Sequence, residues 1–147
     1  MPVVLGTYDP SQQTIVFNGT IIDGYADDTF IKVSRNEDTF MFKPSNSGGG
    51  ARSRNPNRSG RFEFTLHGGS PSNAYLSTLA RTDELAGTGV GECLVVDRNT
   101  AAASCFGAQA WIVKPADFER QKEIGNVSWV IESVDVFIQH DGLVPLS

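Results

Sequence analysis

Cysteine and histidine are scarce in this chain, which has two of each among its 147 residues. Neither Cys93 nor Cys105 has a companion at the spacing of a zinc finger or zinc ribbon. His67 and His140 have no serine or cysteine nucleophile in a recognisable elbow around them. We therefore expect no metal site, no cofactor and no catalysis that depends on histidine.

Long hydrophobic runs are also missing. No stretch approaches the roughly 20 apolar residues of a membrane-spanning helix. The first ten residues contain no basic region followed by an apolar segment of signal-peptide length. We expect a protein that does not associate with membranes and that matures in the cytoplasm, where free thiols are usual.

Basic side chains are outnumbered, with 12 Lys and Arg against 17 Asp and Glu, a net charge of −5 and a pI of about 4.9. A duplex-binding protein needs a net basic face to neutralise phosphates, so general affinity for nucleic acid is excluded. A single-strand binder would interleave arginines with aromatic residues, and the stretch from Arg52 to Arg61 contains no aromatic residue. We expect that nucleic acid near this protein does not bind to it.

The few basic residues are concentrated in one segment. Arg52, Arg54, Arg58 and Arg61 lie within ten residues that contain no acid, so this stretch carries +4 while the remainder carries −9. We expect residues 44–60 to form a long basic loop without regular secondary structure, which in compact domains usually marks an interaction element. The alternative is a mobile, solvated loop with no partner.

Alternation of polar and apolar residues recurs through most of the chain and predicts a mainly β protein with antiparallel strands. The clearest strand is Arg61–His67, in which Phe62, Phe64 and Leu66 point to one face and polar side chains to the other. The other expected strands are Thr14–Asn18, Thr20–Tyr25, Thr29–Arg35, Asp38–Lys43, Gly91–Asp97, Ala101–Phe106, Gln109–Lys114 and Val127–Ile138.

One helix is expected over residues 71–82. Ser70–Asn73 supplies capping residues and a first-turn proline, and Tyr75, Leu76 and Leu79 then share a helical face that would pack on the sheet. The whole chain, 1–147, is expected to be a single domain with an extended N-terminal arm (1–12) and an extended C-terminal tail (139–147).

Val127–Ile138 places apolar side chains on both faces of one long strand. Trp129, Ile131 and Phe137 lie on one face, and valines and an isoleucine lie on the other. A strand of this kind must be covered on both sides, by a second sheet or by a partner chain.

The two cysteines flank a hairpin turn that we centre on Arg98 and Asn99. This register places Cys93 opposite Ser104 and Cys105 opposite Glu92, so the two thiols would lie on opposite sheet faces and remain free. A register slip of one residue would instead bring the cysteines opposite each other.

Other patterns that suggest chemistry have simpler explanations. The glycine run Gly87–Gly91 follows a helix and opens a strand, the reverse of a phosphate-binding loop, and is interpreted as a helix C-cap and turn. The pairs Asp27-Asp28 and Glu37-Asp38 are adjacent in sequence, so their side chains diverge on a strand. Trp111 and Trp129 are typical core or interface anchors. A hydrolase would need a convergent polar cluster that the sequence does not supply, so we expect no enzyme.

Six segments, taken together and in order, resemble the tail tube proteins of contractile-tailed bacteriophages. They are Gly6–Pro10, Gly24–Phe30, Arg35–Phe40, Asn57–Arg61, Ser70–Asn73 and Ala110–Pro115. No single segment is a chemical signature, and the resemblance depends on their collinearity over the whole chain. It implies an antiparallel β-barrel or sandwich with one flanking helix and a long inter-strand loop, similar to the type VI secretion tube subunit.

The resemblance also implies a function. Hexameric rings would stack into a hollow tube that conducts viral DNA, in a virion tail assembled in the cytoplasm of the host bacterium. Implied partners are copies of this chain, the sheath, the tape measure protein, and the baseplate and terminator proteins. The alternative is a tail terminator or capsid-decorating protein that forms discrete rings.

Two sets of residues follow from this interpretation. The arginine loop would lock rings together by pairing with carboxylates of the next subunit. Carboxylates on or beside the strands would line the lumen and repel DNA phosphates; the candidates are Asp27, Asp28, Glu37 and Glu63. The alternative for these four is the outer surface.

Overall fold

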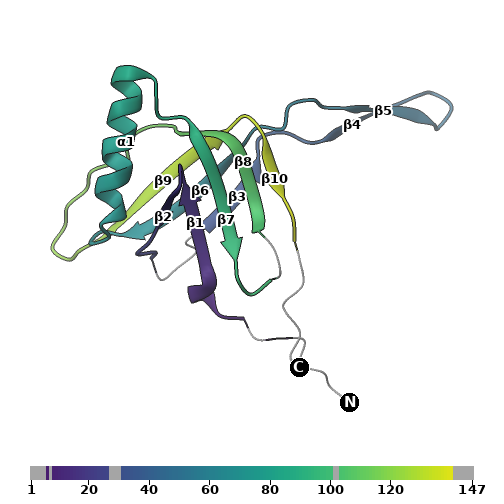
Figure 1. Ribbon diagram of the computed structural model, residues 1–147. Helices are drawn as coiled ribbons and strands as arrows, with labels where there is room; N and C mark the ends of the chain where they lie inside the picture. The colour runs from purple at the N-terminus through teal and green to yellow at the C-terminus, as the bar shows by residue number, and fades with distance from the viewer. Residues whose placement is uncertain (1–5, 7, 27–30, 101–102, 141–147) are drawn as a thin grey trace, which may run out of the picture.

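The computed structural model describes residues 6, 8–26, 31–100 and 103–140, and shows a mainly β protein with one α-helix among these residues (Figure 1). The predicted fold class is confirmed: strands pair antiparallel, and the main sheet folds into a sandwich rather than closing into a barrel. The predicted lumen residues Asp27 and Asp28 lie outside the described residues.

The elements follow one another as a short 3-10 turn, ten strands and a helix. In chain order they are η1 (Pro10–Gln12), β1 (Gln13–Phe17), β2 (Thr20–Ile22), β3 (Ile31–Arg35), β4 (Phe40–Pro44), β5 (Gly50–Arg54), β6 (Gly60–His67), α1 (Ser72–Ala86), β7 (Gly91–Asp97), β8 (Ala103–Ile112), β9 (Asn126–Ser133) and β10 (Val136–Ile138).

The main sheet has the strand order β2-β1-β7-β8-β9-β6-β3, and β10 also pairs with β8. We call β2, β1, β7, β8 and β10 the front layer, and β9, β6 and β3 the back layer, as they are seen in Figure 1. The apolar face of each layer points inward, as period-two alternation requires.

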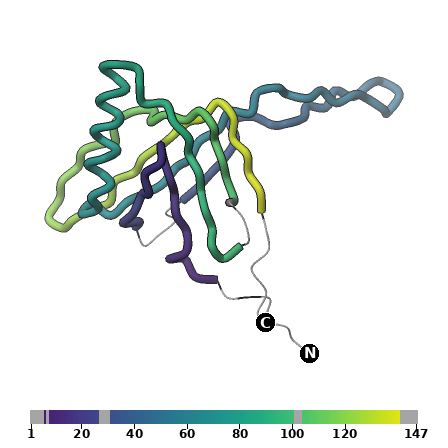
Figure 2. The backbone as a smooth tube through the Cα atoms, in the orientation of Figure 1, coloured from purple at the N-terminus to yellow at the C-terminus, as the bar shows by residue number. Residues whose placement is uncertain are grey.

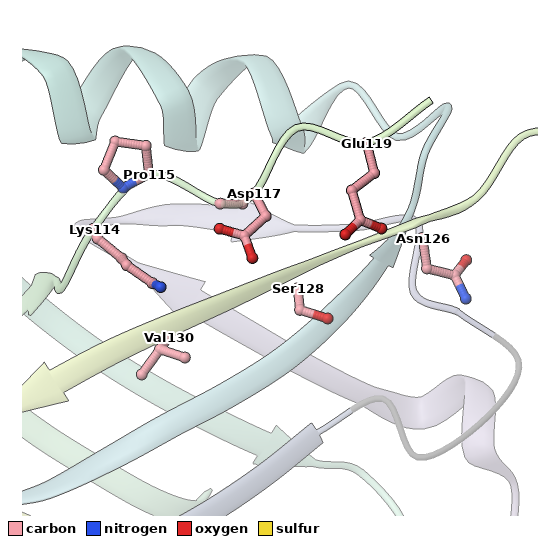
Figure 3. A pocket seen from close by; sticks show the side chains of 8 residues that line it. Lys114, Pro115, Asp117, Glu119, Asn126, Ser128 and Val130 are labelled. Carbon is pink, nitrogen blue, oxygen red and sulfur yellow. The ribbon is translucent and has the colours of Figure 1, made fainter. Parts of the chain in front are cut away.

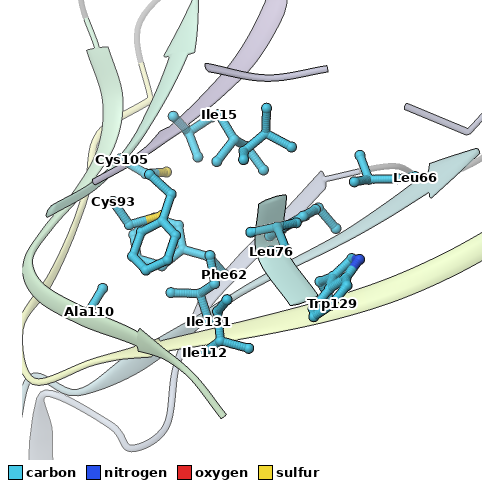
Figure 4. Packing of buried hydrophobic residues seen from close by; sticks show 14 of the residues in the cluster. Ile15, Phe62, Leu66, Leu76, Cys93, Cys105, Ala110, Ile112, Trp129 and Ile131 are labelled. Carbon is cyan, nitrogen blue, oxygen red and sulfur yellow. The ribbon is translucent and has the colours of Figure 1, made fainter. Parts of the chain in front are cut away.

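The core lies between these layers, and Figure 4 shows how its side chains converge. Ile15 and Phe17 enter from β1, and Phe62 and Leu66 enter from β6, all with no measurable exposure. Trp129 of β9 closes the core beside the helix, where its indole Nε1 donates to Asn73 Oδ1 at 3.0 Å. The buried indole therefore keeps a hydrogen-bond partner.

Helix α1 covers one side of the sandwich. Leu76 is fully buried, and Tyr75 and Leu79 pack against the core from partly buried positions. The helix ends where Gly87 adopts a left-handed conformation at φ 68°, and its N–H donates to the carbonyl oxygen of Asp83 at 2.7 Å. The C-cap interpretation of the glycine run is confirmed, although the helix extends four residues beyond the predicted 82.

The strand predictions were wrong in two regions. β8 is one continuous strand where two were expected. Its Cys105–Gly107 part pairs with β10 and its Ala110–Ile112 part pairs with β9, so both expected segments belong to the same strand. The expected strand Val127–Ile138 is instead divided into β9 and β10. Ser133 bends the chain there, since its hydroxyl donates to the carbonyl oxygen of Asp135 at 3.0 Å.

The predicted placement of the two thiols on opposite faces was also wrong. Cys93 pairs with Gly107 and Cys105 pairs with Val95, so both cysteines point into the core. The turn is longer than two residues, and register shifts along β7 and β8 complete the change in phase. Both thiols are free and buried, and burial raises the pKa of Cys93 to about 12.

Candidate assembly surfaces

A β-hairpin projects from the sandwich (Figures 1 and 2). It consists of β4 and β5, which form a two-stranded sheet of their own, and we call residues 40–54 the hairpin arm. The expectation of an irregular loop over 44–60 was therefore wrong for Gly50–Arg54. These residues pair with Phe40–Pro44 because a turn at Ser45–Gly49 brings the two segments together.

The turn at the tip is held by backbone hydrogen bonds. Ser45 N–H donates to the carbonyl oxygen of Gly49 at 2.8 Å, and Gly48 has φ 90°, a conformation that glycine adopts without a side-chain penalty. The glycine run that suggested a loop thus supplies the turn of a hairpin.

One face of the arm combines aromatic rings with arginines. Phe40 is paired with Arg54 and Phe42 with Arg52, so these four side chains share a face. The guanidinium carbon of Arg52 lies 4.0 Å from the centre of the Phe40 ring, a cation–π contact. Phe42 is nevertheless 67 % exposed. An isolated two-stranded hairpin is marginally stable in water, so this face is suited to covering by a partner.

The base of the arm is anchored by Glu37. The Nδ2 groups of Asn55 and Asn57 donate to Glu37 Oε2 at 2.9 and 2.8 Å, and Asn55 N–H donates to the carbonyl oxygen of Thr39 at 2.8 Å. The hydrogen bonds from Asn55 and then Asn57 lower the pKa of the Glu37 carboxyl. Glu37, predicted as a lumen carboxylate, therefore lies where it orients the arm.

Replacing Glu37 by alanine should loosen the arm, because Asn55 and Asn57 lose their shared acceptor. Trypsin should then cleave after Arg52 and Arg54 a few times faster, since cleavage follows the population of the open form. Electrophoresis of timed digests measures the rate. Asp38→Ala is the matched control, since the Asp38 backbone oxygen that accepts from Asn55 Nδ2 remains; equal acceleration in both variants would contradict the anchoring role.

The structure separates the four predicted arginines into two pairs. Arg52 and Arg54 lie on the arm, whereas Arg58 and Arg61 belong to the body. The carbonyl oxygen of Arg58 accepts from Val136 N–H at 2.9 Å, and Arg61 of β6 is paired with Glu132 of β9. Only the first pair is available to reach beyond the outline of the sandwich.

The outer face of the back layer is polar. Glu63 lies on this face, between Lys32 of β3 and Val130 of β9 in the strand register. Thr65 Oγ1 and Ser128 Oγ share a hydrogen bond of 3.3 Å on the same face. The predicted lumen residue Glu63 thus lies on a hydrophilic surface with charges of both signs.

The outer face of the front layer is apolar along a row that crosses five strands. In the strand register Ile21 pairs with Val16, Val16 with Leu94, Leu94 with Phe106 and Phe106 with Phe137. We call these five residues the apolar row. Ile21 and Phe137 are 62 % and 54 % exposed, so nothing in this chain covers the ends of the row among the described residues.

Sequence reasoning missed the apolar row. The signal was present in part, because apolar residues on both faces of 127–138 predicted a need for a partner chain or a second sheet. The second sheet accounts for Ile131 and Trp129, which are buried, while Phe137 remains on the outside. Joining it to Ile21 required the pairing of strands far apart in the sequence.

A shallow pocket of about 280 Å³ lies between the connector that follows β8 and strand β9 (Figure 3). Its charged lining residues are Lys114, Asp117 and Glu119, and Ser128 projects into it from β9. Its lining includes no histidine or cysteine to pair with a hydroxyl group. Within the described residues, no cluster of three or more His, Cys, Asp or Glu could hold a metal, and no helix is long and apolar enough to cross a membrane.

Comparisons with known proteins find likeness in three dimensions. No protein-family model and no curated protein sequence matches the chain. A cryo-EM structure of the anti-feeding prophage cap, the AFP tube terminating cap, matches with TM-score 0.65 and 8 % identity over 95 % of each chain. The PVC sheath/tube terminator of an extracellular contractile injection system, in the extended state, matches with TM-score 0.61 and 8 % identity over 91 % of this chain and 97 % of that one. At this identity the likeness establishes the shared fold.

Proposed function

We propose that this chain is a structural subunit of the ring that terminates the tube of a contractile phage tail or a related injection system. The observation that carries the proposal is its fold, which matches a tube terminating cap and a sheath/tube terminator over almost the full length of all three chains. The proposal favours the terminator, the alternative from the sequence, over the tube subunit.

The charge distribution supports head-to-tail assembly of identical copies. The hairpin arm contains three basic side chains and no acidic one, so it carries +3 and the rest of the chain −8. A basic projection on one copy is complementary to the acidic body of another, which favours association in one orientation. A heterologous interface of this kind closes into a ring when its rotation permits.

The polar outer face of the back layer is suited to the lumen of such a ring. Glu63 remains a candidate lumen carboxylate, and a hydrated, mixed-charge wall would let DNA pass without the adhesive contacts of a basic surface. Glu37 is less suited to this role, because it anchors the arm. In a terminator the ends of the ring would contact the tube and the sheath, which are the proposed partners of this chain.

Electron microscopy of the purified protein tests this function. We expect discrete rings of uniform diameter that do not stack at high concentration, and a reconstruction should place Glu63 at the lumen wall. Long stacked tubes would favour the tube subunit instead. A chain that stays monomeric at high concentration, even when produced together with its tube and sheath proteins, would contradict both.

A further inference from the structure

We propose that the apolar row is the docking surface for the hairpin arm of a second copy of this chain. The inference rests on the proposed function only in that it requires copies to associate. It adds the identity of the two surfaces that meet, namely the face of the arm that carries Phe40 and Phe42, and the row that runs from Ile21 to Phe137.

The row has the geometry of an interface core. Its five side chains are direct cross-strand neighbours, so they form one continuous band rather than scattered apolar contacts. At one end Ile21 also lines a cavity of about 530 Å³ together with Thr14 and Tyr25. Interfaces are commonly anchored by an aromatic side chain inserted into a pocket of this kind.

The arm has the complementary chemistry. Phe40 and Phe42 are 39 % and 67 % exposed, and they are carried on a projection that is well separated from the front layer in Figures 1 and 2. Exposed aromatic rings on a two-stranded ribbon are suited to burial against an apolar surface. Every copy of the chain carries such a surface in its apolar row. Both surfaces are buried at once if one copy inserts its arm against the row of the next.

The arm does not reach its own row, because its base is held to the body. Arg35 Nε donates to the carbonyl oxygen of Val136 at 3.0 Å, and Asn36 Nδ2 donates to Glu132 Oε1 at 3.1 Å. These contacts join the segment that enters the arm to β9 and β10 and direct the arm outward. The partner is therefore another chain, and the resulting contact is head-to-tail.

Charge selects the orientation. Glu92 precedes Leu94 by two residues on β7, so its exposed carboxylate stands on the outer face beside the row. On the arm, Arg52 and Arg54 share the face of Phe40 and Phe42. Apolar contact between the rings and the row would place the guanidinium groups near Glu92, where an Arg–carboxylate pair adds geometric specificity.

Cysteine cross-linking between two full-length variants tests the docking. Phe42→Cys and Phe137→Cys are purified separately and oxidised alone and as an equimolar mixture. We expect a disulfide-linked dimer chiefly in the mixture, with its linkage between residues 42 and 137 verified by peptide mass spectrometry. Wild-type protein controls for the native cysteines, which are buried.

Met41→Cys is the matched control on the arm, because Met41 is also well exposed, at 57 %, but points to the opposite face. Its mixture with Phe137→Cys should lose the cross-link. A disulfide that forms mainly within Phe137→Cys alone would show that two rows pack against each other and would overturn the proposal. Wild-type rings without a 42–137 link would also overturn it while leaving the proposed function standing, whereas absence of any association would contradict both.

Discussion

Replacing the hairpin arm, Phe40–Arg54, by the dipeptide Asn-Gly should abolish assembly and leave the subunit folded. Thr39 and Asn55 are already joined by a backbone hydrogen bond of 2.8 Å, so a two-residue turn can close the gap. The arm contributes nothing to the core, because every residue of Phe40–Arg54 is exposed. Sedimentation should show monomers where the wild type forms rings, and thermal unfolding should remain cooperative.

A second variant tests whether assembly needs the two aromatic rings of the arm or only the presence of the arm. Phe40→Ser with Phe42→Ser removes the rings but keeps Arg52 and Arg54, and should also prevent ring formation. Its control is Met41→Ser, on the opposite face of β4, which should assemble normally. Rings of ordinary size from the protein without the arm would refute the role of the arm in assembly.

Phe62→Ala should cost about 3–5 kcal/mol of folding free energy, as is usual for a buried phenylalanine in a tightly packed core. Phe62 is fully buried, and a Cβ placed on Gly107 would lie only 3.1 Å from Phe62 Cε1, so the ring packs directly over that glycine. Neighbouring strands cannot collapse into the space because they are held in register by the sheet. Urea unfolding, performed on the variant without the arm so that assembly does not contribute, measures the change.

Phe106→Ala is the matched control for the core prediction. Phe106 is 38 % exposed on the outer face, so its removal should change the stability of the monomer much less. The same substitution should weaken assembly, because Phe106 is part of the apolar row and lies between Leu94 and Phe137. Equal losses of monomer stability in the two variants would contradict the assignment of Phe62 to the core and of Phe106 to the outer face.

Local pattern was sufficient for much of the fold. Strict alternation in Arg61–His67 identified β6 and its buried face, and the helical spacing of Tyr75, Leu76 and Leu79 located α1, although the N-cap is Pro71 and has no side-chain capping hydrogen bond. These features depend on side chains within a few residues of each other, so periodicity alone reveals them. The mainly β class with one helix followed from the same signals, whereas the barrel or sandwich architecture was implied by the resemblance to tail tube proteins.

The arm was misjudged for a physical reason. Glycine, serine and proline between Pro44 and Asn57 are typical of loops, and the sequence offers no apolar alternation in Gly50–Arg54 to indicate a strand. That segment is a strand because it pairs with Phe40–Pro44, and cation–π contact with Phe40 supports the pairing. The prediction that Cys93 and Cys105 lie on opposite faces was wrong for a similar reason. It depended on the register between β7 and β8, and the register shifts between these strands cannot be detected in the sequence of either strand by itself.

The sequence by itself determined the fold class, the helix, the buried face of the clearest strand and the concentration of basic charge in one segment, because each depends on neighbours in the chain. Only the tertiary structure decided which residues share a surface. It separated Arg58 and Arg61 from the arm, assigned Glu37 to the base of the arm, and joined Ile21 to Phe137 across five strands. The physical reason is that strand order and register are set by contacts between distant segments, and a surface made by such pairing has no continuous trace in the sequence.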